Sequence, residues 1–186
     1  MELRTLLDRL ECFPIIASVR EVKFAAALEC PADVLFYLEA KLSTVEQRVR
    51  QAHEKGKLLF VHIDLAEGIG KDKEGLQYLV SIGVDGVIST RLQTIRMAKE
   101  LNLITVQRFF ALDSQGLDSM QEMVKNAAPH MMEIMPGVAP KVIRRFSEGT
   151  IPVIAGGLIN QKQEITAALA AGATAISTGC RELWYE

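Results

Sequence analysis

Short apolar runs alternate along the chain with amphipathic stretches of helical spacing. One apolar run, residues 151–159 (IPVIAGGLI), is rich in β-branched side chains, which is typical of a buried strand. It contains Gly156-Gly157, and Asn160 and Gln163 then have the spacing of a helix capping box. The pattern predicts a strand, a glycine turn and a helix in direct succession.

The same alternation of strand and helix recurs from the beginning of the chain to its end. Alternating strands and helices with short connections predict a parallel sheet, and eight such units predict a closed barrel. We therefore predict an α/β fold, a compact TIM-type (β/α)8 barrel, with residues 1–186 forming a single domain. The predicted strands cover residues 14–20, 33–38, 57–65, 85–89, 103–107, 130–135, 151–159 and 173–179.

The two ends of the chain depart from a regular barrel. Leu3, Leu6, Leu7 and Leu10 have helical spacing and are separated by polar and charged residues, which predicts an extra N-terminal helix that covers the bottom of the barrel. Only residues 181–186 follow the last strand, so the last helix is predicted to be truncated. An open doubly wound sheet is the alternative fold.

Composition and charge narrow the class of protein. The chain is 49% hydrophobic, which suits a full core, and its formal net charge of −2 neither supports nor excludes a nucleic-acid partner. No apolar run is long enough to span a bilayer, and the three cysteines have no paired spacing. These features predict a cytoplasmic protein with free thiols and no membrane partner. A basic group on one short helix, Lys141, Arg144 and Arg145, is most simply a solvated face.

Two consecutive predicted strands end in turns that suit an anion. The first ends in Gly156-Gly157 and the second in Ser177-Thr178-Gly179. Glycine lets backbone N–H groups approach a ligand closely, and a following helix adds partial positive charge at its N-terminus. Barrels of this class often bind phosphate after strands seven and eight. The sequence therefore predicts a phosphate site at these two turns.

Polar side chains are predicted to gather at the same end of the barrel. Because side chains alternate along a strand, His62 and Asp64 share a face with Phe60 and should point into the barrel. Glu133 ends another strand, and Arg108 begins a predicted long loop, residues 108–117. The candidate ligand-binding residues are Arg20, His62, Asp64, Arg108, Glu133, Gly156, Gly157, Ser177, Thr178 and Gly179.

These polar residues admit other interpretations. His62 and Asp64 could form a purely structural pair. Together with Glu133 they have the atoms of a metal site, although we expect no metal. The same three residues beside a phosphate site could also run acid–base chemistry, so an enzyme acting on a small phosphorylated polyol or sugar phosphate is the alternative function.

Several sequence blocks, taken together, resemble the glycerol uptake operon antiterminator family. They occur in the family's order over almost the whole chain, with one departure at Gly179-Cys180, where the family more often continues with Thr-Ser. The blocks are His62-Ile63-Asp64-Leu65 with Gly68, residues 85–91 (DGVISTR), Gln107-Arg108 with Asp113-Ser114, residues 133–137 (EIMPG), residues 154–159 (IAGGLI), and Ala175-Ile176-Ser177-Thr178 with Leu183-Trp184.

The resemblance implies a regulator rather than an enzyme. Members of the family sense glycerol 3-phosphate and act on leader mRNA, so that transcription passes a terminator upstream of glycerol-uptake genes. The expected partners are therefore glycerol 3-phosphate and leader mRNA, with no cofactor, and a homo-oligomer remains open. No RNA-binding residue follows from the resemblance, and the sequence contains no common RNA-binding module.

Overall fold

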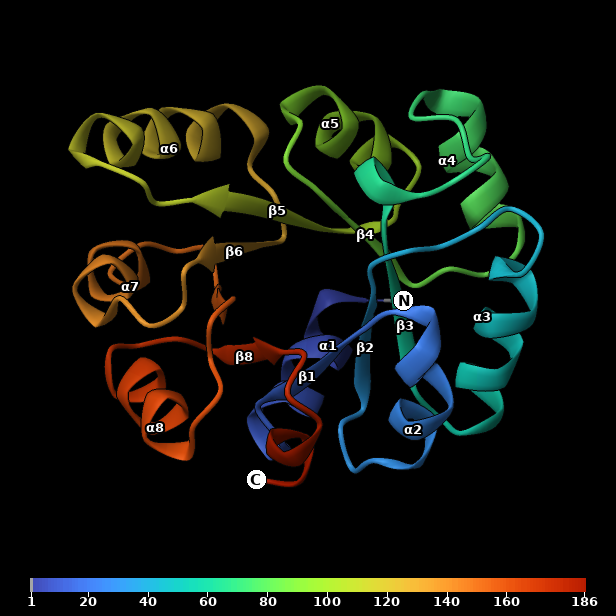
Figure 1. The fold of residues 1–186 in the computed structure, drawn as a ribbon. Coiled ribbons are helices and arrows are strands. Elements are labelled where there is room, and N and C mark those ends of the chain that lie inside the picture. The colour runs from blue at the N-terminus through green and yellow to red at the C-terminus, as the bar shows by residue number, and fades with distance from the viewer. Residues whose placement is uncertain (1) are drawn as a thin grey trace.

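Eight parallel strands close into a barrel in the order in which they occur along the chain (Figure 1). The computed structural model describes residues 2–186. The predicted (β/α)8 architecture is confirmed, and the open sheet is excluded. The strands are β1 (Ile15–Val19), β2 (Val34–Tyr37), β3 (Leu58–His62), β4 (Gly86–Ser89), β5 (Ile104–Phe110), β6 (Met131–Met135), β7 (Val153–Gly156) and β8 (Ala175–Thr178).

A ring of helices surrounds the strands, one after each of the first seven (Figure 1). After β8 a short 3₁₀ helix, η3 (Arg181–Tyr185), replaces the last α-helix, which confirms the predicted truncation. Within residues 2–186 no helix has the length and apolar character needed to cross a membrane. The helices of the ring are α2 (Phe24–Glu29), α3 (Val45–Glu54), α4 (Lys73–Ser81), α5 (Leu92–Glu100), α6 (Ser114–Ala127), α7 (Pro140–Ser147) and α8 (Lys162–Ala170), with 3₁₀ helices η1 (Glu21–Lys23) and η2 (Ile63–Leu65) in two loops.

The helix α1 (Leu3–Cys12) closes the bottom of the barrel, as predicted. Its side chains Leu6 and Leu10 are each 1% exposed and belong to the same buried cluster as the interior residues Ile16 and Met131. Burying two leucines in the barrel end removes apolar surface from water and stabilises both the helix and the barrel. The lower interior is therefore a packed apolar core.

Side chains alternate between the interior of the barrel and the layer beneath the helices. On β3, Phe60 belongs to the interior cluster, whereas Val61 belongs to the outer one. This alternation places His62 on the interior side, as predicted. The strand ends at His62, however, and η2 follows, so the prediction that Asp64 continues the alternation is wrong.

The strand β5 is longer than the sequence predicted. It runs to Phe110 because its ladder with β6 continues from Val106 opposite Met131 to Phe110 opposite Met135. Arg108 is therefore part of a strand, and the predicted long loop over residues 108–117 is wrong. The helix α6 begins soon afterwards, with the Asp113 carboxylate accepting the N–H of Gly116 at 2.7 Å as its N-cap.

Shortening a buried side chain of α1 tests whether this helix seals the bottom of the barrel. We expect Leu10→Ala to lower the free energy of unfolding by about 2–5 kcal/mol, because it leaves a cavity in a packed core. Arg4→Ala on the exposed side of α1 is the control, with an expected change within about 0.5 kcal/mol. Urea unfolding measures both variants, and a Leu10→Ala protein as stable as the control would show that α1 does not seal the core.

A polar pocket at the mouth of the barrel

A pocket of about 480 Å³ opens at the carboxyl ends of the strands. It lies among the ends of β1, β5, β6, β7 and β8 and the loops that follow them. Its lining includes most of the residues that the sequence singled out. These are Arg20, Arg108, Glu133, Gly157, Ser177, Thr178 and Gly179.

The turn after β7 has an unusual backbone. Gly157 and Leu158 follow each other in the left-handed region, with φ of +75° and +62°. Glycine adopts this conformation without cost, whereas leucine rarely does. In residues 2–186 no acceptor receives the backbone N–H of Gly157 or of Leu158. The turn therefore offers two free donors beside the pocket.

The helix after this turn begins one residue later than predicted. The N-cap of α8 is Gln161, which forms a capping box with Glu164. The carboxylate of Glu164 accepts the N–H of Asn160 at 2.7 Å and that of Gln161 at 2.9 Å. The N–H groups of Asn160 and Gln161 are therefore paired within the protein. The unpaired N–H groups are those of Gly157 and Leu158, at the start of the turn.

The two hydroxyl groups at the end of β8 have different environments. Ser177 faces the interior and lines the pocket, and its hydroxyl bonds to no other described residue. The Thr178 hydroxyl instead donates to the Ile159 carbonyl at 2.8 Å and accepts the Cys180 N–H at 3.0 Å. Thr178 thus joins the loops after β7 and β8, and Ser177 is the hydroxyl that remains free for a ligand.

A buried ion pair forms the floor of the pocket. Arg108 Nε donates to Glu133 Oε2 at 2.6 Å, and the two side chains are 7% and 0% exposed. Glu133 Oε1 is buried without a hydrogen-bond partner in the described chain. Within the described residues, the Arg108 guanidinium makes its side-chain hydrogen bond to Glu133 through Nε, and its terminal amino groups are left for a ligand or water. Buried charges are costly unless further polar groups satisfy them, so this floor suits a polar ligand.

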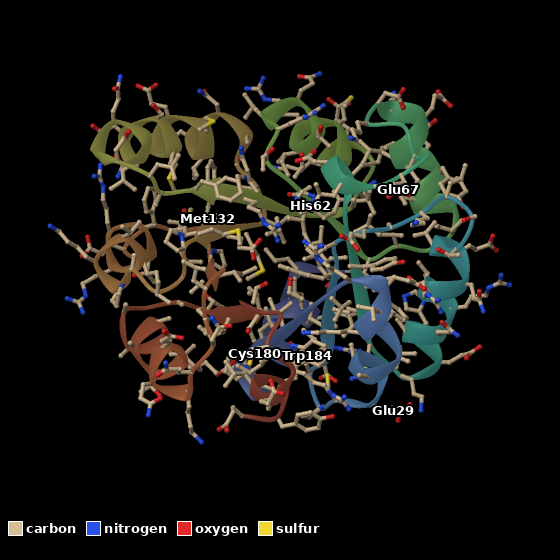
Figure 2. All side chains as sticks on the ribbon, viewed as in Figure 1. Glu29, His62, Glu67, Met132, Cys180 and Trp184 are labelled. Atoms are coloured by element: carbon tan, nitrogen blue, oxygen red, sulfur yellow. The ribbon has the colours of Figure 1, made fainter. Side chains whose placement is uncertain are left out.

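His62 lies outside the pocket lining, and Figure 2 shows it across the barrel from Cys180, which does line the pocket. The ring is 3% exposed, and its Nδ1 has no partner among residues 2–186. Burial, together with the charge of Arg108, lowers the pKa of His62 to about 4. The ring is therefore neutral at neutral pH.

Asp64 is held away from the pocket by the loop after β4. Its carboxylate accepts the Ser89 hydroxyl at 2.8 Å and the Thr90 N–H at 2.7 Å. Burial alone would raise the pKa of Asp64, but these hydrogen bonds outweigh it and hold the pKa below its usual value. His62, Asp64 and Glu133 do not form a metal site, and residues 2–186 contain no group of three metal-binding side chains.

The rim of the pocket carries two further cations. Arg20 pairs with Glu39 at 2.8 Å, and both side chains are exposed. Lys23 on η1 donates to the Gly179 carbonyl at 2.8 Å and lines the pocket. Sequence reasoning missed Lys23 because the residues after β1 carry no glycine turn or strand periodicity. The sequence indicated a role for Lys23 in the pocket only through its position, in the loop that follows the first strand.

Fold and site together define a TIM-type barrel whose polar pocket, rich in unpaired donors, lies at the carboxyl ends of the strands. The chain belongs to the glycerol-3-phosphate responsive antiterminator family, whose profile matches residues 15–184. The family expected from the sequence blocks is thereby confirmed.

Solved structures agree with this assignment. The glycerol uptake operon antiterminator regulatory protein from Listeria monocytogenes is 30% identical with a TM-score of 0.87, over 92% of this chain and 95% of that one. A glycerol uptake operon antiterminator-related protein from Thermotoga maritima is also 30% identical, with a TM-score of 0.83, over 91% and 96% of the two chains. The uncharacterized protein YgcP of Escherichia coli is 30% identical over 182 residues, 96% of this chain and 95% of its own.

Enzymes share the architecture at much lower identity. An aldolase, QR15, superposes with a TM-score of 0.72 at 13% identity. At this identity the likeness shows the barrel fold alone.

The shifted pKa of His62 has a consequence for stability. Between pH 6.5 and about 4 the unfolded chain binds a proton at this residue and the folded chain does not. The free energy of unfolding should therefore fall by roughly 2–4 kcal/mol as the pH falls through this window. His62→Gln removes the titration, so the variant should lose that part of the pH dependence. Urea unfolding across the window measures it, and parallel pH profiles of variant and wild type would contradict the assignment.

Proposed function

We propose that this protein binds glycerol 3-phosphate in the mouth pocket and that the liganded form acts on leader mRNA to let transcription pass a terminator upstream of glycerol-uptake genes. Family membership supports the ligand and the regulatory role. The observation that carries the proposal is the set of unpaired donors around one pocket. They are the N–H groups of Gly157, Leu158 and Gly179, the Ser177 hydroxyl and the Arg108 guanidinium.

The phosphate is assigned to the turns after β7 and β8. Backbone N–H groups that converge from two loops bind an anion without a dedicated lysine or arginine. Among the charged residues of the lining, Arg20 pairs with Glu39 and Arg108 pairs with Glu133, so the lining has no large excess of positive charge. The directed donors of the two turns are therefore the main support for a phosphate at this place.

The glycerol end is assigned to the ion pair on the pocket floor. Glu133 Oε1 is an acceptor without a donor, and a glycerol hydroxyl supplies one. Gly156 is required beside it, because a Cβ there would lie 2.3 Å from Glu133 Oε1. Arg108, held by Glu133, has terminal amino groups free to donate to a hydroxyl or to the phosphate ester oxygen.

An enzyme that acts on the same kind of ligand is the competing function. Acid–base chemistry needs titratable groups within hydrogen-bonding reach of the substrate. Of the three residues on which that hypothesis rested, only Glu133 lines the pocket, and it is paired with Arg108. The geometry thus favours binding over turnover. Incubation with glycerol 3-phosphate, followed by phosphate and product analysis, tests this directly, and conversion would favour the enzyme.

Gly157→Val tests the phosphate site. A side chain there starts 2.6 Å from the Met135 methyl group that lines the pocket, and the left-handed backbone penalises it further. We expect affinity for glycerol 3-phosphate to fall more than tenfold in calorimetric titration. Glycerol, which lacks the phosphate, should bind wild type far more weakly than glycerol 3-phosphate does.

Gly56→Val is the matched control for this experiment. Gly56 also has a left-handed backbone, with φ of +70°, but a Cβ there meets nothing within 4 Å, and the residue is remote from the pocket. This variant should lose stability and keep ligand affinity. Unchanged binding by a folded Gly157→Val protein, or equal binding of glycerol by wild type, would overturn the placement of the phosphate.

A further inference from the structure

A second concavity, of about 440 Å³, lies on the outside of the barrel between α6 and α7. We call it the α6–α7 groove and define it by its apolar residues Val124, Met132, Phe146 and Ile151. Met132, labelled in Figure 2, belongs to β6, so the groove reaches the sheet between the two helices. Within residues 2–186, side-chain hydrogen bonds between α6 and α7 come only from Arg145, to Asp118 at 2.6 Å and Gln121 at 3.2 Å.

Positive side chains flank this groove. Lys125 of α6 and Arg145 of α7 line it. The helix α7 also carries Lys141 and Arg144, and it has no acidic residue. This is the basic group that the sequence left as a solvated face. The groove therefore combines an apolar floor with two lining cations, Lys125 and Arg145, of which Arg145 pairs with Asp118.

The combination fits single-stranded RNA. Proteins that bind single-stranded nucleic acid place unstacked bases against apolar surface and track the phosphates with Lys and Arg. In a chain of net charge −2, a local basic strip is where an RNA backbone gains the most.

The groove and the mouth pocket are built on the same part of the barrel, around β5 and β6. Its two helices follow β5 and β6, the strands that carry Arg108 and Glu133, and these two residues face each other in the strand register. Met132 on the groove floor directly precedes Glu133. The loop before α7 is tied to the phosphate turn, since the Gly137 N–H donates to the Gly157 carbonyl at 3.1 Å. The shared strands and this backbone hydrogen bond are the structural link between the two sites.

We propose that the α6–α7 groove binds a single-stranded segment of RNA, with a base against its apolar floor and phosphates on Lys125 and Arg145, and that occupancy of the mouth pocket sets its affinity. The inference rests on the proposed function, because it names the surface through which the regulator meets its leader mRNA. Binding linkage makes the effect reciprocal, so that RNA raises the affinity for glycerol 3-phosphate by the same factor.

The test compares two double variants that remove the same charge. Lys125→Gln/Arg145→Gln changes the two cations that line the groove, and Arg50→Gln/Lys55→Gln changes the C-terminal end of α3, across the barrel in Figure 1. We measure fluorescence anisotropy of single-stranded leader RNA with the full chain, with and without glycerol 3-phosphate, over a range of salt concentrations. We expect the groove variant to lose on the order of tenfold in affinity and the salt slope to fall by roughly 1–1.5. The α3 variant should match wild type.

Further measurements distinguish a failure of the groove proposal from a failure of the proposed function. Calorimetry should show that the groove variant retains its affinity for glycerol 3-phosphate, which establishes that the barrel and the mouth pocket are intact. Gly157→Val should retain ligand-free RNA affinity and lose the effect of the ligand. If wild type binds no leader RNA with or without ligand, the proposed function itself fails. If wild type binds RNA and the two double variants bind it equally, the groove is wrong and the proposed function stands.

Discussion

The structure of the mouth depends on one interaction, the buried ion pair between Arg108 and Glu133. Two charges inside a barrel are expensive, and removing one partner of such a pair typically costs about 3–5 kcal/mol because the other is left uncompensated. The strand register keeps them together, since β5 continues far enough to bring Arg108 opposite Glu133. Gly156 on the next strand leaves the space that the carboxylate fills. The extra length of β5 thus brings the two residues together, and the glycine at the end of β7 leaves room for the carboxylate.

The barrel interior changes character along its axis. At the bottom, α1 seals an apolar core with Leu6 and Leu10, and the phenyl rings of Phe36 and Phe60 pack 5.6 Å apart between their centroids. At the top, the interior positions become His62, Arg108, Glu133 and Ser177. The lower half supplies the hydrophobic free energy that holds the strands in register. That rigidity lets the upper half keep donors and acceptors without partners of their own.

Much of this arrangement was predictable from the sequence, and what was missed has a common physical cause. Periodicity and local turn chemistry, which depend on neighbouring residues alone, predict the eight strands, the N-terminal helix α1, the truncated last helix and the glycine turn. The ends of elements depend on partners far away in the chain. β3 stops at His62, and the Asp64 beyond it accepts hydrogen bonds from Ser89 and Thr90; β5 continues past Gln107 because β6 offers it a ladder. Lys23 reaches the pocket through a contact with Gly179, which lies 156 positions further along the chain, so no local pattern could reveal it.

Around the mouth, the titratable side chains are constrained, whereas several hydrogen-bond donors are unpaired. This contrast suits a barrel that binds a ligand, even though an aldolase has the same fold. The groups around the mouth that commonly move protons are constrained: His62 is buried and neutral, with a pKa of about 4, and Asp64 is saturated by the loop after β4. The groups that remain free are donors fixed on the backbone or held by an ion pair. Donors that are fixed in place need no rearrangement to receive an anion, which suits binding better than proton transfer. The strands β5 and β6, which carry Arg108 and Glu133, continue into α6 and α7, so the mouth is connected along the chain to the helices that border the α6–α7 groove.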